Sequence, residues 1–405
     1  MKILLTTIYA YPPRGGLGKY MHELKAGLEK NGHEVEILAR HHGEYYLTTS
    51  NGRYLIKRKK SSGRSHPLLS SGWVGKRVWK FLDKIQDEAK KYFDAVRSID
   101  LEQYQVIHAQ EIISASVLDV YNPRSTPVIL TLHGCVTAEY YYYGLIKPGS
   151  TGWNLLSSFE SEVIQRSDKT IVPSRWLLNV CLRCGIPTEN IQVISNGIDI
   201  PAFKRQMNKN TGLSSPSNKK IIICTGRLEK VKGQHVLLDS LAQLKKKRSD
   251  WVCWIVGKGG MEKALKKKSK RHGLGKYVKF LGRRDDIPAL LKQADIFVIP
   301  SLEDNYPYSL IEAQVAGKAI IGSKAGGITE MVDHSENGLL VPPGNSQALY
   351  REMKKLLENR GVRKRLSSNS ESWSLKHCSL STMTKRVLNV YTRAMSMKSA
   401  TRSGQ

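Results

Sequence analysis

The residues of this 405-residue chain that could do chemistry gather at the start of one predicted helix. The stretch SLEDNYPYSLIEAQ follows an apolar run, ADIFVIP, and it brings together Glu303, Asp304 and Glu312. A carboxylate at Glu312, one turn into the helix, can accept hydrogen bonds from two hydroxyls, as on a ribose. Asp304 lies in the preceding loop, where it could meet sugar hydroxyls or a developing positive charge. Either acid alone would more often cap a helix or face solvent, so the interpretation depends on the neighbouring residues.

Two cations follow another predicted strand. The stretch GRLEKVKG places Arg227 at the end of that strand and Lys232 at the start of the next helix. Both can face one anion, and the amino end of the helix near Tyr308 adds backbone N–H groups. At about 4 Å and an effective dielectric constant near 20, each charge pair contributes roughly 4 kcal/mol before desolvation. This set predicts a diphosphate site that needs no metal ion.

The elements that must position these residues form two series of alternating strands and helices. The first series has predicted strands at 2–7, 34–40, 104–110, 127–134, 169–174 and 191–195. The second has predicted strands at 221–228, 250–259, 278–284, 294–300, 318–327 and 338–343. This alternation predicts an α/β fold with two doubly wound, Rossmann-like parallel sheets. Ligands of such sheets bind beyond the carboxyl ends of the strands, which is where Gly16, His133, Arg227 and the acids lie.

The domain boundaries follow from the polar stretch between the two series. We expect a first domain at 1–198, a linker at 199–220 and a second domain at 221–374. The segment 375–396 has helical spacing of apolar residues, and we expect this helix to cross back onto the first domain. The glycine-rich turn RGGLGKY lacks the spacing of a dinucleotide fingerprint, although a helix that begins after such a turn can bind phosphate.

The net charge of +29 is unevenly distributed. Residues 1–200 hold 25 Lys and Arg against 19 Asp and Glu, whereas residues 201–405 hold 39 against 16. This positive charge could bind nucleic acid, an anionic membrane or phosphorylated small molecules. The basic runs lack interleaved aromatic residues and a nucleic-acid motif, so we expect no nucleic-acid partner.

Several features indicate a cytoplasmic protein. The apolar runs are far shorter than the roughly 20 residues that span a membrane, and MKILLTTIYAYPPRGG does not read as a signal peptide. In that compartment the six cysteines are expected to be reduced. The pair Cys181 and Cys184 has metal-like spacing, but no second pair accompanies it, which disfavours a zinc site.

In order and spacing, the motifs resemble those of the retaining family 4 glycosyltransferases, which have the GT-B fold. The resemblance covers most of the chain and rests on GGLGKY, LHG, VPS, VISNGID, GRLEKVKG, IVGKGG, LGRRDDI, PSLEDNYPYSLIEAQVAGKAIIGSKAGGITEMV and NGLLVPPGN. The two glutamates of the family motif, with seven residues between them, fall on Asp304 and Glu312. Either Asp304 replaces the first glutamate, or Glu303 takes its place after a shift of the loop.

This resemblance implies two domains that face each other across a cleft, the second of which binds a UDP- or GDP-type sugar donor. Arg227 and Lys232 would hold the diphosphate and Glu312 the ribose, while Gly16 would approach the distal phosphate. The backbone that cradles this phosphate would be that of Tyr306, Pro307, Tyr308, Ser309 and Leu310. His133 would act beside the donor sugar, with Asp304 and Glu312, and residues 196–199 would shape the hinge.

The implied reaction is a metal-independent front-face displacement, in which the leaving diphosphate takes the proton of the acceptor. We expect no cofactor and no metal site, since an Asp-x-Asp motif is absent from the sequence. The nearest carboxylates of the first domain are Glu111 and Glu139, and with Tyr140 they are candidate acceptor-side residues. A sugar-nucleotide epimerase on the same scaffold is the alternative function, and it would need no acceptor.

Two segments bear on the acceptor. The tyrosine-rich stretch 133–153 could stack on sugar rings or pack internally. The basic amphipathic stretch 64–93 could lie on an anionic membrane or pack on the sheet. The charge favours membrane contact, and therefore a glycan or lipid-linked acceptor in polysaccharide, glycolipid or lipopolysaccharide synthesis. The enzyme would then be peripheral on the inner face of the cell membrane.

Overall fold

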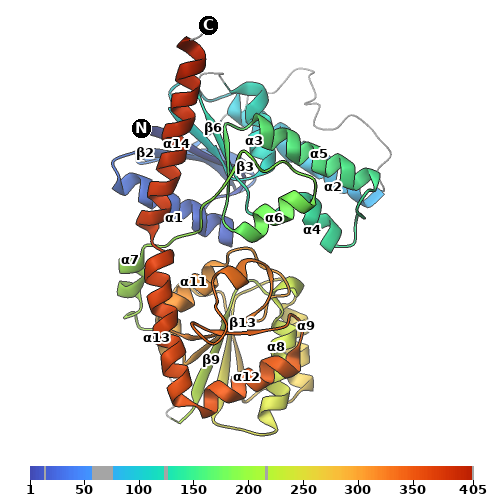
Figure 1. The fold of residues 1–405 in the computed structure, drawn as a ribbon, viewed down its shortest axis with the longest axis vertical. Helices are drawn as coiled ribbons and strands as arrows, with labels where there is room; N and C mark the ends of the chain where they lie inside the picture. Colours follow the sequence, from blue (N-terminus) through green and yellow to red (C-terminus); the bar gives the residue numbers. More distant parts are fainter. Residues whose placement is uncertain (13–14, 57–75, 123–125, 215–217, 404–405) are drawn as a thin grey trace. The chain divides into compact units, whose positions relative to one another are not determined.

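The computed structural model divides the chain into two compact units (Figure 1). The first unit contains Met1–Ser195 and Met383–Gln405, and the second contains Asn196–Thr382. The structure describes residues 1–12, 15–56, 76–122, 126–214 and 218–403, without the side chains of 76–85 and 401–403. The segment predicted as a linker carries helix α7 (Ile200–Gln206), which Asp199 caps by accepting from the amide of Ala202 at 3.0 Å.

The first unit is built on an eight-stranded sheet in the order β4-β3-β2-β1-β5-β6-β7-β8. Its parallel strands are β1 (Lys2–Ala10), β2 (Glu34–His41), β5 (Val106–Ala109), β6 (Val128–Thr131), β7 (Lys169–Val172) and β8 (Ile191–Val193). The predicted parallel sheet is confirmed, with one addition at its edge that the sequence did not predict. There β3 (Glu44–Thr49) and β4 (Gly52–Leu55) add an antiparallel hairpin to β2.

The helices of the first unit follow its strands in the doubly wound manner. They are α1 (Gly16–Lys30), α2 (Lys76–Val96), α3 (Ile112–Tyr121), α4 (Val136–Tyr142), α5 (Thr151–Arg166) and α6 (Arg175–Arg183). Most of the stretch 64–93, predicted as a membrane or packing helix, lies outside the described residues or side chains. The described face of α2 is buried through Ala89 and Tyr92, each 0% exposed.

The second unit is built on a six-stranded parallel sheet in the order β11-β10-β9-β12-β13-β14. The strands are β9 (Lys220–Thr225), β10 (Trp251–Val256), β11 (Val278–Gly282), β12 (Ile296–Ile299), β13 (Ala319–Ser323) and β14 (Leu339–Val341). Every residue of β10 is buried, as expected for a parallel strand covered on both faces. The chain order reverses between β9 and β12, and ligands of open α/β sheets bind beyond this switch point.

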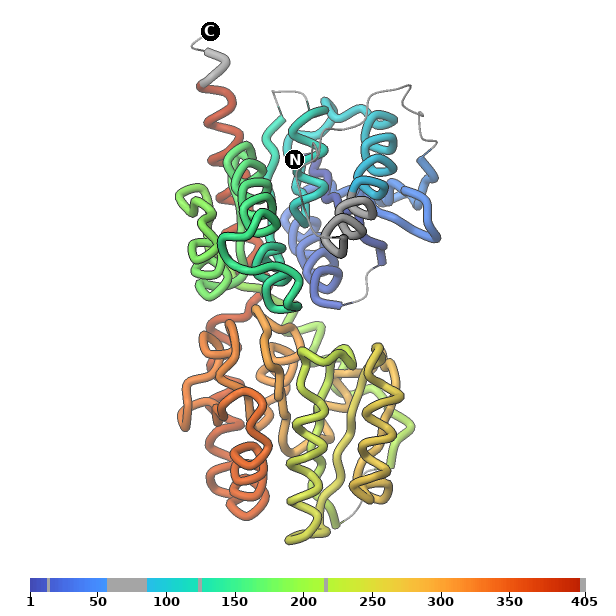
Figure 2. Tube along the Cα trace, turned by 90° about the vertical axis from the view of Figure 1, so that its right-hand side faces the viewer, coloured from blue at the N-terminus to red at the C-terminus, as the bar shows by residue number. Residues whose placement is uncertain are grey.

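Helices cover the second sheet, and a last helix returns to the first unit. The covering helices are α8 (Gln234–Lys245), α9 (Glu262–Arg271), α10 (Ile287–Gln293), α11 (Tyr308–Val315), α12 (Ser346–Glu358) and α13 (Arg360–His377). The predicted helix at 375–396 is α14 (Leu380–Ser403), which belongs to the first unit from Met383 onward. It lies along the elements of that unit in both views (Figure 2). Within the described chain, no helix combines the length and apolarity that crossing a membrane requires.

Candidate functional site

The loops after β9 and β12 meet at the switch point of the second sheet. Lys232 ends a short 3-10 turn, Lys230–Lys232, and its Nζ lies 2.7 Å from Oδ2 of Asp304. The amide of Leu302 donates to the carbonyl oxygen of Val231 at 2.7 Å. The sequence placed both residues at the carboxyl edge, but it did not predict that they form an ion pair.

Asp304 is held from several sides. The hydroxyl of Ser301 donates to Oδ2 at 3.0 Å, and the Asp304 carbonyl oxygen accepts from the amide of Gly327 at 2.9 Å. Its side chain is 11% exposed. These contacts make Asp304 a positioning group for the Lys232 ammonium, which has three protons and therefore keeps donors for an anion.

Two glycines allow this close approach of the loops. Gly233 has a φ of +69° and Gly326 a φ of +59°, in the left-handed region where side chains are strained. A Cβ at Gly233 would overlap the carbonyl oxygen of Pro300, and one at Gly326 would overlap that of Asp304. The backbone around the Lys232–Asp304 pair therefore has no room for larger residues.

Arg227 lies in the same loop after β9 as Lys232, and its side chain is exposed. Its carbonyl oxygen accepts from Nε2 of the buried Gln234 at 2.9 Å, which fixes the backbone. Within the described ranges, no carboxylate forms an ion pair with its guanidinium. The switch point therefore presents one unpaired cation and one positioned cation, as a diphosphate site requires.

Glu303 lies in the same loop and has an unusual pKa. Burial and the neighbouring Asp304 raise the pKa of its carboxyl to about 7, and Lys232 opposes the shift. Glu303 is therefore largely neutral under mildly acidic conditions, whereas Asp304 carries the ion pair. The sequence left open which of the two fills the first acidic position, and the structure gives them different environments.

The helix predicted to begin near Tyr308 is α11, and it begins at that residue. Glu312 lies half-buried in its second turn, and Pro307 and Ser309 are also half-buried. The side chains of Tyr306, Tyr308 and Leu310 are at most 7% exposed, so these residues can offer a ligand mainly their backbone. The carbonyl oxygen of Tyr306 accepts from Nδ2 of Asn196 at 3.0 Å, within the second unit.

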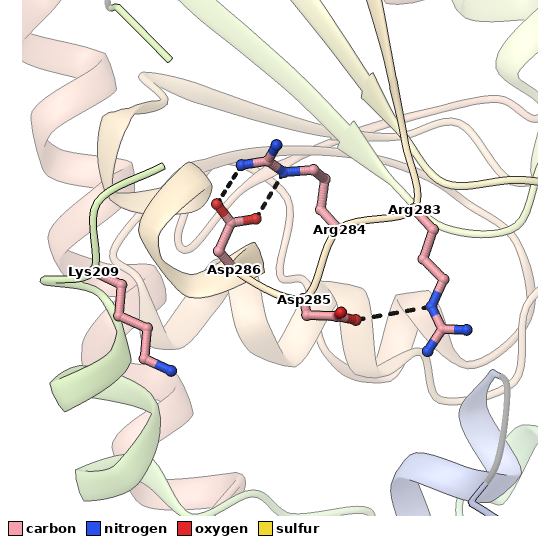
Figure 3. A pocket seen from close by; sticks show the side chains of 5 residues that line it. All are labelled: Lys209, Arg283, Arg284, Asp285 and Asp286. Atoms are coloured by element: carbon pink, nitrogen blue, oxygen red, sulfur yellow. Dashed lines mark hydrogen bonds and ion pairs between the residues drawn. The ribbon is translucent and has the colours of Figure 1, made fainter. Parts of the chain in front are cut away.

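A pocket of about 400 Å³ opens beyond β11 at the same carboxyl edge (Figure 3). Its lining residues are Lys209, Arg283, Arg284, Asp285 and Asp286. Arg284 is fixed by Asp286 through two bonds of 2.8 and 2.5 Å, and its Nη2 donates to the carbonyl oxygen of Thr211 at 2.7 Å. The Arg283–Asp285 pair is looser, with 3.8 Å between Nε and Oδ1, and both side chains are exposed. Sequence reasoning singled out none of these residues as ligands.

In the first unit, His133 follows β6 as predicted. Its ring meets that of Tyr20 edge-on, with 4.9 Å between the ring centroids. Burial lowers the pKa of His133 to about 4, so the imidazole is neutral near pH 7. It can serve as a hydrogen-bonding group there, but it does not supply a positive charge.

Behind His133 lies a buried polar chain that the sequence did not predict. Nε2 of His108 lies 2.7 Å from Oγ1 of Thr131, and the same oxygen lies 3.5 Å from the hydroxyl of Tyr20. Nδ1 of His108 lies 2.7 Å from the hydroxyl of Tyr391 on α14. Burial lowers the pKa of His108 to about 3. A histidine inside the apolar strand VIHA was the only local signal of this arrangement.

Glu111 has a structural role in the described geometry. It caps α3 by accepting from the amides of Ile113 at 2.7 Å and Ser114 at 3.0 Å, and it also accepts from Ile8 at 3.1 Å. Burial raises the pKa of this carboxyl, and the hydrogen bonds oppose the shift. Both carboxylate oxygens are engaged, so the geometry gives no support to its predicted acceptor-side role.

Glu139 and Tyr140 lie on α4, close to the end of β1. The Oε1 atom of Glu139 occupies the space beside Gly134 where a Cβ would otherwise lie. Burial, Glu111 and Glu139 together raise the pKa of Tyr9, on β1, to about 12. Burial and Glu139 also raise the pKa of Tyr140. A carboxylate and two tyrosines therefore adjoin the His133 loop in the first unit.

One tyrosine of the tyrosine-rich stretch packs internally, and three are exposed; stacking on a sugar stays a prediction. Tyr140 is 7% exposed and packs in a small apolar cluster with Ile146 and Leu156. Tyr141, Tyr142 and Tyr143 are exposed.

The cysteines of CLRC are buried free thiols on or just after α6. In the part of the chain that the structure describes, no three His, Cys, Asp or Glu residues are grouped to hold a metal ion.

Gly16 begins α1, and a Cβ placed on it would meet no atom within 4 Å. Arg14, in the same glycine-rich turn, lies outside the described residues. The predicted approach of Gly16 to a phosphate stays a prediction.

Comparisons with known proteins cover nearly the whole chain. Residues 14–201 match the model described as Glycosyltransferase Family 4, and residues 206–373 match the one described as Glycosyl transferases group 1. An uncharacterised glycosyltransferase of Methanocaldococcus jannaschii is 26% identical, over 98% of this chain and 99% of its own. The phosphatidyl-myo-inositol mannosyltransferase of Mycobacterium leprae is 23% identical over 96% of each chain. The Anabaena protein HepE, solved with UDP and glucose, has a TM-score of 0.69 at 21% identity, over 97% of this chain and 99% of HepE.

Proposed function

This chain is a glycosyltransferase of family 4, and we propose that it moves a sugar from a UDP- or GDP-sugar to a glycan or lipid-linked acceptor, with retention of the anomeric configuration. The observation that supports donor binding is the Lys232–Asp304 pair at the switch point of the second sheet, with the exposed Arg227 in the same loop as Lys232. The cations and the first turn of α11 suit a diphosphate. HepE was solved with UDP, which makes a UDP-sugar the first donor to test.

The proposed site continues along the carboxyl edge from the diphosphate. Glu312, half-buried on α11, is the proposed acceptor for the ribose hydroxyls. The pocket at Arg283–Asp286 lies on the same edge beyond β11. Because both arginines of the pocket pair with its aspartates, Lys209 is the lining cation left for a ligand, and we propose that the nucleotide base binds here rather than the diphosphate.

The proposed chemistry is a metal-independent front-face displacement. The bond from the sugar C1 to the leaving phosphate oxygen breaks as the acceptor oxygen forms its bond to C1, and the leaving diphosphate takes the acceptor proton. Arg227 and Lys232 would stabilise the charge that develops on the diphosphate. His133 is neutral at the working pH because burial lowers its pKa to about 4, so its proposed role is hydrogen bonding to the donor sugar.

The proposed acceptor rests on one relative and on the charge of the chain. The Mycobacterium leprae relative is named a phosphatidyl-myo-inositol mannosyltransferase, and the net charge of +29 suits an anionic membrane surface. Glu139 and Tyr140 are the proposed acceptor-side residues, because Glu139 lies against Gly134 in the His133 loop. We place the reaction in polysaccharide or glycolipid synthesis, with the enzyme peripheral on the membrane.

The test is a transfer assay with a panel of UDP- and GDP-sugars, a membrane lipid extract as acceptor, and a chelator throughout. We expect one donor to be consumed only when the extract is present, and we expect the product to keep the anomeric configuration of the donor. Consumption that requires added metal, or a product of inverted configuration, would overturn the proposed mechanism. Conversion of the donor sugar without an acceptor would indicate an epimerase.

A further inference from the structure

A second groove lies in the second unit, on α9 and the adjoining edge of the sheet. It has a volume of about 470 Å³. We call it the lysine groove and define it by Lys266, Ser269, Lys270, Lys276, Val278 and Phe280. Neither the family matches nor the proposed donor site gives it a role.

The lysine groove is strongly basic. Residues 258–279 hold nine Lys and Arg and a single acid, Glu262. That acid lies 2.7 Å from Nζ of Lys266. Lys270 and Lys276 are exposed, and no carboxylate among the described residues pairs with either of them. The last turn of α9 also holds Arg271, which is exposed, and Lys268, whose Nζ lies 2.5 Å from Oδ2 of Asp239.

The groove is separate from the proposed donor site. β11 is an edge strand of the second sheet, and Val278 is its first residue. The groove therefore lies at the amino end of β11, whereas the loop that begins at Arg283 leaves its carboxyl end. The lysines of the groove are therefore not needed to bind a diphosphate at Arg227 and Lys232.

The shape and chemistry of the groove favour an anionic amphiphile. Its rim carries the lysine ammonium groups, and its floor includes Val278, which is buried, and Phe280, which is half-buried. The ring of Phe280 lies under Nζ of Lys266 at 6.0 Å, and the ring of Tyr277 packs on Trp251 at 4.9 Å. Both aromatic rings are thus engaged within the protein, which disfavours base stacking by a nucleic acid.

We propose that the lysine groove binds the phosphate head groups of anionic lipids and thereby holds this face of the second unit on a membrane surface. The inference deepens the proposed function and rests on it in one respect, since a membrane-bound acceptor gives the contact its use. A phosphate head group matches the unpaired ammonium groups, and the apolar floor can cover the glycerol and the first methylenes of the lipid. A free phosphate ion would use the rim alone.

The test is vesicle co-sedimentation of the full-length protein at low salt, without donor or acceptor. Vesicles of phosphatidylcholine alone are compared with equimolar phosphatidylcholine and phosphatidylglycerol. We expect binding to the anionic vesicles only. In the variant Lys270→Gln/Lys276→Gln we expect binding about thirtyfold weaker, because each cation near such a surface strengthens binding about fivefold. The matched control Arg360→Gln/Lys364→Gln removes the same charge from exposed sites on α13 of the same unit, and we expect a change below about threefold.

Two further titrations distinguish a lipid head group from free phosphate and from nucleic acid as the ligand of the groove. Inorganic phosphate and a single-stranded oligonucleotide are titrated into the same proteins by calorimetry. Equal losses in the groove variant and the control would reduce the effect to net charge and overturn the groove. Tight phosphate or oligonucleotide binding that depends on Lys270 and Lys276, without vesicle binding, would overturn the lipid assignment. UDP binding, measured on each variant, reports the donor site separately, so a failure of the groove is distinguishable from a failure of the proposed function.

Discussion

The hydroxyl of Tyr391 lies 2.7 Å from Nδ1 of His108, and the two residues are 283 positions apart in the chain. Both side chains are 0% exposed. Through His108 this contact continues to Thr131 on β6, two residues before His133. The last helix therefore closes the polar interior of the first unit behind the residue proposed to act on the donor sugar.

Removing the hydroxyl of Tyr391 should destabilise the first unit. In Tyr391→Phe the buried Nδ1 of His108 loses its partner, which costs about 1–3 kcal/mol. The free energy of unfolding, measured by denaturant titration, should fall by this amount. Tyr143→Phe removes a hydroxyl from a side chain that is 69% exposed, and it should change the stability by less than about 0.5 kcal/mol. Equal stabilities for Tyr391→Phe and the wild type would contradict the buried contact.

The two buried histidines predict a loss of stability in acid. Burial lowers the pKa of His108 to about 3 and that of His133 to about 4, from ordinary values of 6.5. Their contribution is complete above the unfolded pKa, because both states are then neutral. It falls as the pH drops from about 6.5 toward 3, because the unfolded chain binds protons more readily. Unfolding measured from pH 8 to pH 4 should show this slope, and His108→Gln should flatten it. An unchanged slope in that variant would argue against a neutral buried His108.

Glu303 predicts a pH dependence of nucleotide binding. Burial and Asp304 raise the pKa of its carboxyl to about 7, so the group gains a negative charge as the pH rises through this value. An anionic diphosphate nearby should therefore bind more weakly above pH 7 than below it. The affinity for UDP, followed by calorimetry from pH 6 to pH 8.5, should fall, and Glu303→Gln should remove most of the fall. If both proteins show the same pH profile, Glu303 is not near the bound diphosphate.

Gly326 should be intolerant of a side chain for a local reason. Its φ of +59° and its contact with the carbonyl oxygen of Asp304 leave no space for a Cβ. We expect Gly326→Ala to displace the Asp304 loop and to weaken nucleotide binding by about tenfold or more, since backbone strain of this kind costs about 1–3 kcal/mol. Gly275→Ala is the matched control, because a Cβ there meets nothing within 4 Å. Normal binding in Gly326→Ala would show that the loop geometry is not needed.

Local patterns predicted the fold because they report directly on local structure. Strand ends at Arg227 and after Ile299 located the switch point, since parallel strands bring their carboxyl ends to one edge. The β3–β4 hairpin was missed although Asn51-Gly52, a strong hairpin signal, lies where its turn enters β4. The contact of His108 with Tyr391 had no local signal, because it depends on how two distant elements pack.

Like the fold, the candidate donor site could be predicted from the sequence only in part. Residue types and spacing predicted that Lys232 and Asp304 lie at the carboxyl edge of the second sheet. Their pairing could not be predicted, because it depends on the two loop paths that Gly233 and Gly326 permit. Glu111 could not be recognised as a helix cap without the amides of Ile113 and Ser114 in position. The pocket at Arg283–Asp286 was missed, because adjacent residues of opposite charge are typical of a solvated turn.

The central claim is that the switch point of the second sheet holds a nucleotide diphosphate. Calorimetric titration of UDP, GDP and ADP in the presence of a chelator tests it most directly, on the wild type and on Lys232→Ala, Glu312→Ala and Lys230→Ala. The first two variants remove proposed ligands, and Lys230→Ala removes an exposed cation of the same turn as a control. We predict that one nucleotide binds without metal, that Lys232→Ala and Glu312→Ala each weaken it at least about tenfold, and that Lys230→Ala leaves it within about threefold. Absence of binding to the wild type, or equal losses in all three variants, would contradict the claim.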